Sequence, residues 1–225
     1  SVEWKLDGIR IQVHRTGEHV RIWTRNLNDI TDRLPGVVRA VRALPAEVLV
    51  LDGEAMAFDE TGRPHLFQDT VSWRERPGAA TSDADPVPLP DHPDAGDVSG
   101  LRPFFFDVLH VDGRDLVDEP LSVRAAELER VAGAHRIPGT VTGDPATAEA
   151  VLAEALDRGH EGVVAKAVSS TYEAGRRGKA WRKVKPVHTF DLVVLAVEWG
   201  SGRRRGWLSN LHLGARADDG SGFVM

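Results

Sequence analysis

The 225-residue chain contains no cysteine, which excludes disulfide bonds and zinc sites built on thiolates. It has no long uninterrupted apolar run, and it does not open with a basic segment followed by an apolar one. Neither a membrane span nor a secretory signal peptide is therefore expected. These absences fit a reducing compartment, and we expect a protein of the cytoplasm or the nucleoid.

Lysine is scarce as well: the chain has 28 basic residues, and only five of them are lysines. Four of the five lie in the short strings KLDGIR (5–10), EGVVAK (161–166) and WRKVKP (181–186), and the fifth is Lys179. Arginine cannot replace lysine where a neutral amine must attack, because a guanidinium stays protonated. The placement of the few lysines therefore indicates a chemical task for those in the strings, whereas Lys179 is expected to be solvated or to face a nucleic acid.

The net charge of −6 conceals an uneven distribution. Residues 176–207 carry nine basic and two acidic residues, so this segment has a charge of +7 and the rest of the chain −13. A basic block that also contains Trp181, Trp199 and Trp207 can contact the phosphates of a nucleic acid, although a solvated charged face would have the same composition. The nine basic residues are Arg176, Arg177, Lys179, Arg182, Lys183, Lys185, Arg203, Arg204 and Arg205.

Hydrophobic periodicity predicts a chain with both strands and helices. Alternation of apolar and polar residues is typical of half-buried strands, and short apolar runs are typical of buried strands. A predicted helix that starts after Asp144 has this residue as N-cap and Pro145 in its first turn. The predicted strands are 9–13, 20–24, 48–58, 104–111, 162–168 and 181–186, the predicted helices are 37–44, 121–134 and 145–158, and a loop is predicted over 77–103.

Two of the apolar strands carry a carboxylate, Glu54 in one and Asp107 in the other. An ionised carboxylate in an apolar strand is costly unless it is paired or holds a metal or a hydroxyl group. A strand edge or a structural salt bridge would explain either one alone. If neither is accidental, the charged residues of the strings converge on one site that suits a polyphosphate and a divalent cation. These residues are Lys5, Asp7, Arg10, Glu54, Asp107, Glu161, Lys166, Lys183 and Lys185.

The strings together resemble the motifs of the covalent nucleotidyltransferases, and among these the ATP-dependent DNA ligases. A lone K-x-D-G string would be weak evidence, but six motifs occur here in the order of the family. They are KLDGIR (5–10), TRN (24–26), LDGE (51–54), FFFD (104–107), EGVVAK (161–166) and WRKVKP (181–186). Residues 187–225 resemble the opening strands of the oligonucleotide-binding (OB) fold domain that follows in these ligases.

The resemblance implies an α+β fold in which two antiparallel β-sheets are flanked by helices and followed by the beginning of an OB-fold β-barrel. Residues 1–186 would form the adenylation domain without its N-terminal start, and residues 187–225 would form part of the OB-fold domain. The chain opens almost inside its first motif and ends on the run GSGFVM. We therefore expect it to be a fragment of a longer protein.

The resemblance also assigns roles around the nucleophile. Lys5 would attack the α-phosphorus of ATP and form lysyl-AMP. Glu3 would accept a hydrogen bond from the adenine amino group, and Phe106 would stack on the adenine ring. Glu54 would bind the ribose or support the metal indirectly. Glu161 would be a Mg²⁺ ligand, since its carboxylate is a hard oxygen donor.

The remaining motif residues would hold phosphates. Lys166, Lys183 and Lys185 would bind the α-phosphate, and Arg10 and Arg25 would contact ribose hydroxyls or the 5′-phosphate at the break. Glu161 and Lys166 have opposite parity along a strand, so they share a site only if Gly162 bends the chain or the strand starts after Glu161. The candidates for contacts with DNA are Arg25, Arg203, Arg204 and Arg205.

The implied activity is ATP-dependent and Mg²⁺-dependent sealing of nicked double-stranded DNA in replication, repair or recombination, by a monomer that does not associate with membranes. An RNA ligase or a capping guanylyltransferase would share the nucleophile chemistry. An NAD-dependent ligase would have a small residue in place of Arg10. A non-catalytic nucleic-acid-binding module on the same fold is the alternative from a different class, and the intact Lys5, Glu161, Lys183 and Lys185 argue against it.

Overall fold

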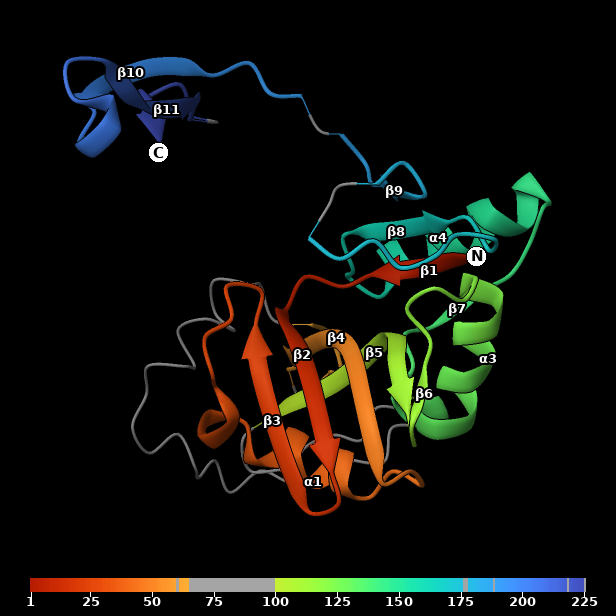
Figure 1. Ribbon diagram of the computed structural model, residues 1–225. Coiled ribbons are helices and arrows are strands. Elements are labelled where there is room, and N and C mark those ends of the chain that lie inside the picture. The colour runs from red at the N-terminus through yellow and green to blue at the C-terminus, as the bar shows by residue number, and fades with distance from the viewer. Residues whose placement is uncertain (60, 65–99, 176–177, 188, 218, 225) are drawn as a thin grey trace. The chain divides into compact units, whose positions relative to one another are not determined.

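Two antiparallel sheets form the Ser1–Lys185 unit of the computed structural model, and Pro186–Met225 forms a second unit (Figure 1). The structure describes residues 1–59, 61–64, 100–175, 178–187, 189–217 and 219–224. The first unit also contains α-helices, and each unit is described by itself below.

The larger sheet of the first unit has five strands in the order β3-β2-β4-β5-β6. Its apolar face includes Ile11, Leu51 and Phe105, which are fully buried in the main core together with residues of α1 and α3. The polar face contains the alternate residues of β2 and β4. The elements are β2 (Ile9–Thr16), β3 (His19–Thr24), η1 (Thr31–Arg33), α1 (Pro35–Arg42), β4 (Val48–Ala57), β5 (Leu101–Val111), β6 (Arg114–Asp115) and α3 (Leu121–Ala132).

The smaller sheet has four strands in the order β7-β1-β8-β9. Trp4 on β1 and Val163 on β8 pack with Ala155 of α4 in a second core cluster. The helix begins as the sequence predicts: the Asp144 side chain accepts a hydrogen bond from the Thr147 N–H (2.9 Å). The elements are β1 (Val2–Lys5), η2 (Gly133–His135), β7 (Gly139–Thr140), α4 (Pro145–Asp157), β8 (Gly162–Lys166) and β9 (Trp181–Val184).

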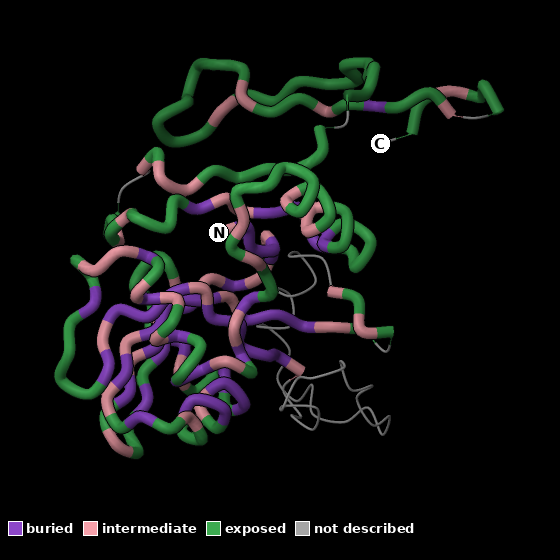
Figure 2. Tube along the Cα trace, turned by 90° about the vertical axis from the view of Figure 1, so that its right-hand side faces the viewer, coloured by how far each residue is buried: buried purple, intermediate pink, exposed green. Residues whose placement is uncertain are grey.

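The second unit is a three-stranded antiparallel sheet, β10-β11-β12. Most of its residues are exposed, whereas the strands of the first unit are largely buried (Figure 2). Its elements are β10 (Val193–Trp199), η3 (Gly202–Arg204), β11 (Leu208–Arg216) and β12 (Phe223–Val224). None of the described helices in either unit is long and apolar enough to cross a membrane.

The predicted α+β class with antiparallel sheets is confirmed, and two local expectations need correction. The strand β1 was not predicted from periodicity, and β5 begins at Leu101 rather than at 104. Pro103 is tolerated there because β5 pairs with β6 only at His110 and Val111. The predicted loop therefore does not reach 103, and its part over 77–99 lies outside the described residues.

The packing of His160 against Trp4 predicts acid sensitivity. Their ring centroids lie 4.8 Å apart, His160 is 8% exposed, and burial lowers the pKa of its imidazole to about 4. Because the unfolded chain protonates this group near pH 6.5 and the folded chain does not, its contribution to stability is present above about pH 6.5. That contribution is lost as the pH falls toward 4, with a total cost of about 2–3 kcal/mol.

His160→Phe should therefore flatten the loss of stability between pH 7 and pH 4.5, as measured by urea unfolding at both values. The control is His19→Gln, because His19 is exposed at the start of β3. Equal pH dependence in the wild type and His160→Phe would show that His160 is protonated without cost in the folded protein.

Candidate active site

The alternation of β1 places the nucleophile candidate on the polar side of the smaller sheet. Trp4 faces the α4 core, so Glu3 and Lys5 project from the opposite face. The Lys5 ammonium forms an ion pair with Glu161, which also accepts a hydrogen bond from Lys185 Nζ (2.7 Å). Burial lowers the pKa of Lys5, and the positive charges of Lys183 and Lys185 lower it further.

Gly162 resolves the parity conflict between Glu161 and Lys166. It has a φ of +146°, and β8 begins at this residue, directly after Glu161. A Cβ atom at this position would lie 2.3 Å from the carbonyl oxygen of Val184, so only glycine fits. The strand therefore starts after Glu161, and both Glu161 and Lys166 can face the site.

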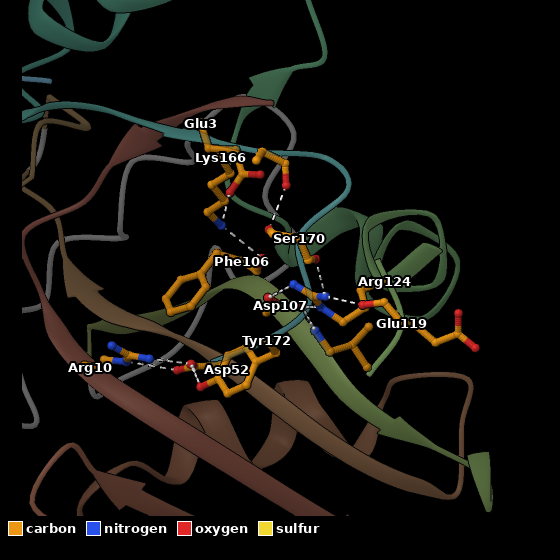
Figure 3. A network of polar contacts seen from close by, with 12 residues as sticks. Glu3, Arg10, Asp52, Phe106, Asp107, Glu119, Arg124, Lys166, Ser170 and Tyr172 are labelled. Atoms are coloured by element: carbon orange, nitrogen blue, oxygen red, sulfur yellow. Dashed lines mark hydrogen bonds and ion pairs between the residues drawn. The ribbon is translucent and has the colours of Figure 1, made fainter. Parts of the chain in front are cut away.

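A second group of contacts surrounds Lys166 (Figure 3). Its ammonium lies 2.5 Å from Glu3 Oε2 and donates to the carbonyl oxygen of Phe106 (3.3 Å). It also lies 4.8 Å from the ring centroid of Phe106 and 4.2 Å from that of Trp181, and these two rings meet edge to face at 5.7 Å. The structure thus places Lys166 with Glu3 and Phe106, whereas Lys185 contacts Glu161.

The larger sheet contributes Arg10, which forms a two-point ion pair with Asp52. Arg10 Nε and Nη2 lie 3.1 and 2.5 Å from the two carboxylate oxygens. Arg10 Cζ lies 5.4 Å from the Phe106 ring centroid, so this pair adjoins the Lys166 group. Glu54, opposite Arg10 in the β2–β4 register, has a buried Oε2 with no hydrogen-bond partner among the described residues, and burial raises its pKa to about 8.

Asp107 lies near Lys166 and Asp52, as expected for a charge beside the site, but its carboxylate is already paired within the protein. It forms a two-point ion pair with Arg124 Nε and Nη2 at 2.7 and 3.0 Å, and both side chains are 0% exposed. Arg124 also donates to the carbonyl oxygens of Glu119 and Ser170. Both oxygens of the Asp107 carboxylate therefore bind Arg124 in a structural ion pair. A structural salt bridge was one of the alternatives that the sequence left open for this residue.

The other predicted residues have fewer contacts. Lys183 is exposed on β9 opposite Val164, and Asp7 is exposed in the turn after β1. Arg25 is exposed after β3. Arg203, Arg204 and Arg205 are exposed in the second unit. Arg176 and Arg177 lie outside the described residues.

Three residues with contacts in this site, Asp52, Trp181 and Tyr172, were not predicted from the sequence to belong to it. Asp52 lies inside the string LDGE, and Trp181 opens the string WRKVKP, so a closer look at these motifs could have included both. Tyr172 lies in no string, and its only signal is that it is the single tyrosine of the chain.

A cavity of about 840 Å³ lies on the other face of β1. Its lining includes Trp4, Phe58, Phe104 and His160, but none of the predicted site residues. We place the candidate active site on the Lys5 face because the nucleophile candidate and its charged partners are there.

The donor set on the Lys5 face suits a divalent cation only in part. No group of three or more His, Cys, Asp or Glu side chains that could hold a metal occurs among the described residues. Glu161 and Glu54 are nevertheless hard oxygen donors near Lys5, and the buried Glu54 Oε2 lacks a partner in the described ranges of the chain. Two carboxylates fit Mg²⁺ when substrate phosphates supply further oxygen ligands.

Known proteins resemble this chain in sequence over its whole length. Residues 1–185 match the family model described as "ATP dependent DNA ligase domain". A "Probable DNA ligase" of Beutenbergia cavernae is 60% identical over 225 residues, and one of a Nocardioides species is 56% identical over 226 residues. The alignments cover 100% of this chain but 41% of each relative, so the chain spans about two fifths of the length of these curated proteins.

Solved structures show the same fold. The ligase domain of LigD from M. tuberculosis is 28% identical, with a TM-score of 0.63 over 100% of this chain and 65% of that one. A mycobacterial DNA ligase D complexed with ATP and MES is 27% identical, with a TM-score of 0.64 over 100% of this chain and 64% of that one.

Proposed function

Because the chain belongs to the ATP-dependent DNA ligase domain family, we propose that it transfers AMP from ATP to its own Lys5 and then to the 5′-phosphate at a nick in DNA. The observation that carries the proposal is the position of Lys5, which is partly buried and paired with Glu161 beside Lys185. A scarce lysine held by a carboxylate among further cations has the features of a nucleophile that attacks a phosphoanhydride.

The proposed first step is an in-line displacement at the α-phosphorus of ATP. The Lys5 amine forms the N–P bond, and the P–O bond to pyrophosphate breaks. The amine must first lose a proton, and its lowered pKa favours that loss. Lys183 and Lys185 would stabilise the charge that develops on the phosphates.

The contacts of Lys166 support a place for the nucleotide base. Glu3 would accept from the adenine amino group and Phe106 would stack on the ring, and both already contact Lys166. The geometry therefore favours a place for Lys166 at the base end, and its predicted contact with the α-phosphate would require it to leave Glu3. Arg10, held by Asp52 beside Phe106, would then contact the ribose or the 5′-phosphate.

Glu161 and Glu54 would hold Mg²⁺ together with the phosphates of ATP. The bound cation would neutralise phosphate charge as the displacement proceeds. Glu54 would have to release its proton first, because burial raises its pKa to about 8.

Intact mass after incubation with ATP, GTP or NAD tests this function. We expect one AMP adduct, formed with ATP in the presence of Mg²⁺ and mapped to Lys5 by peptide analysis. An adduct formed only with GTP would indicate a capping-type transferase, and one formed with NAD an NAD-dependent ligase. A chain that forms no adduct with any of the three would support the non-catalytic module.

We further propose that residues 187–225 begin an OB-fold domain that contacts nicked duplex DNA through Arg203, Arg204 and Arg205. The three arginines are exposed around the short helix η3. Replacing all three with alanine should reduce the slope of log affinity against log salt by roughly two to three, since each phosphate contact releases counterions.

A matched control variant has alanine in place of Arg114, Arg130 and Arg158. It loses the same charge, but these three arginines form ion pairs within the first unit. Fluorescence anisotropy with a labelled nicked duplex over a range of salt concentrations measures both slopes. Equal slopes for the two triple variants would mean that Arg203–Arg205 form a solvated loop without phosphate contacts.

A further inference from the structure

Residues 167–175 follow β8, and we call them the β8–β9 connection. Main-chain hydrogen bonds join this segment to the start of α3 and to the residues just before it. The main-chain N–H groups of Leu121 and Ser122, at the start of α3, donate to the carbonyl oxygens of Ser170 (2.8 Å) and Val168 (2.9 Å). The Tyr172 N–H donates to the carbonyl oxygen of Val117 (3.0 Å). The connection therefore holds the Tyr172 side chain in a defined place between the two sheets.

The Tyr172 side chain reaches Asp52 on β4 (Figure 3). Its hydroxyl donates to Asp52 Oδ2 at 2.6 Å, and the same oxygen accepts from Arg10 Nη2 at 2.5 Å. Asp52 is 2% exposed, so its orientation is set by protein donors. The Tyr172 ring also meets the Trp181 ring edge to face at 6.4 Å, and Trp181 in turn faces Lys166.

We propose that Tyr172 is a positioning residue that fixes the orientation of Arg10 through Asp52. The inference rests on the proposed function, in which Arg10 contacts ATP or the 5′-phosphate. Arg10 uses Nε and Nη2 on Asp52, and its side chain is 40% exposed. Within the described part of the chain its Nη1 forms no hydrogen bond, so this group is available to a substrate oxygen. In a two-point ion pair the orientation of the guanidinium depends on the orientation of the carboxylate. The Tyr172 hydroxyl donates to the Asp52 carboxylate in addition to the two Arg10 nitrogens, so it helps to fix that orientation.

Tyr172 joins parts of the site that come from different sheets. The smaller sheet contributes Lys5 and Lys166, the larger sheet contributes Arg10, and the tyrosine hydroxyl is a direct polar contact between the β8–β9 connection and β4. A displacement of this connection would therefore change the aim of Arg10 relative to Lys5. Small errors in such an alignment have large effects on phosphoryl transfer, which depends chiefly on positioning.

Tyr172→Phe is the sharpest variant, since it removes the hydroxyl and keeps the ring that packs on Trp181. Single-turnover formation of lysyl-AMP should fall by about 10-fold, as expected for a lost hydrogen bond to a charged group. The melting temperature should stay close to that of the wild type. Thr171→Ala, an exposed change in the same connection, is the control and should leave the rate unchanged.

A double-mutant cycle with Arg10→Ala separates positioning from a purely structural role. If Tyr172 acts through Arg10, then Tyr172→Phe costs nothing further in the Arg10→Ala background. If the two losses multiply instead, Tyr172 acts independently of Arg10 and the inference is overturned.

A second readout does not depend on activity. In the nuclear magnetic resonance spectrum, the Arg10 Nε–H signal, assigned by its loss in Arg10→Ala, should broaden or shift in Tyr172→Phe. A wild-type chain that forms no adduct would overturn the proposed function, yet this signal would still report on Tyr172. An unchanged signal together with an unchanged adenylation rate would overturn the inference alone.

Discussion

Lys5→Ala and Lys5→Arg are both expected to abolish formation of the AMP adduct, with a fall of at least about 10³-fold, while the fold is retained. Alanine removes the nucleophile. Arginine keeps the positive charge and the partner Glu161, but a guanidinium cannot supply a neutral nitrogen at any pH at which the protein is folded. Equal loss in the two variants separates a nucleophile from a lysine that only binds phosphate, because arginine would satisfy a phosphate.

Lys179→Ala is the matched control, since Lys179 is exposed and lies outside the site. The measurement is transfer of radiolabelled AMP from ATP to protein, with circular dichroism to verify folding. A Lys5→Arg protein that still acquires the label would rule out Lys5 as the attacking group. If the Lys5→Ala protein still acquired the label on a lysine, the nucleophile would be another residue, with Lys166, Lys183 and Lys185 as the candidates.

The fold was largely predictable because its strands carry clear periodic signals. Ile9, Ile11 and Val13 alternate with polar residues, and in the structure they are the buried apolar residues of β2. β1 gave no such signal, since three of its four residues, including Glu3, are buried. A buried strand that carries a carboxylate does not show period-2 alternation, so only its motif could reveal it.

The candidate site could be proposed from the sequence where a residue's chemistry is rare in the chain. Scarcity of lysine pointed to Lys5 and Lys166, and the structure brings both to the polar face of the smaller sheet, with Glu161 and Glu3 as partners. It was less predictable where the partner is distant in the sequence. Asp52 is 120 residues from Tyr172, and no local pattern links the two.

Asp107 illustrates the limit of arguing from buried charge. Its place in an apolar strand correctly indicated that it must be paired, but it did not say with what. Arg124 lies on α3, and from the sequence alone an arginine on a helix is expected to be exposed. Its burial results from the packing of α3 against β5. Tertiary packing thus decided between a structural and a catalytic carboxylate.

Arg124→Met is expected to lower the free energy of unfolding by about 3–5 kcal/mol, because it leaves the Asp107 carboxylate buried without a partner. Burial already raises the pKa of Asp107, and the Arg124 guanidinium opposes that rise. The variant also removes the donors on the carbonyl oxygens of Glu119 and Ser170. Urea unfolding of the purified chain at pH 7 measures the change.

Arg130→Met on the same helix is the matched control, because Arg130 pairs with Glu127 at the surface and should cost less than about 0.5 kcal/mol. A double variant, Asp107→Leu with Arg124→Met, should recover much of the loss, since it removes both buried charges. If Arg124→Met and the double variant were equally unstable, the loss would come from packing and from the two carbonyl oxygens rather than from the unpaired carboxylate. The ion pair would then be dispensable, and the reason for a buried aspartate in β5 would have to be sought in the neighbouring Phe106 and Lys166 instead.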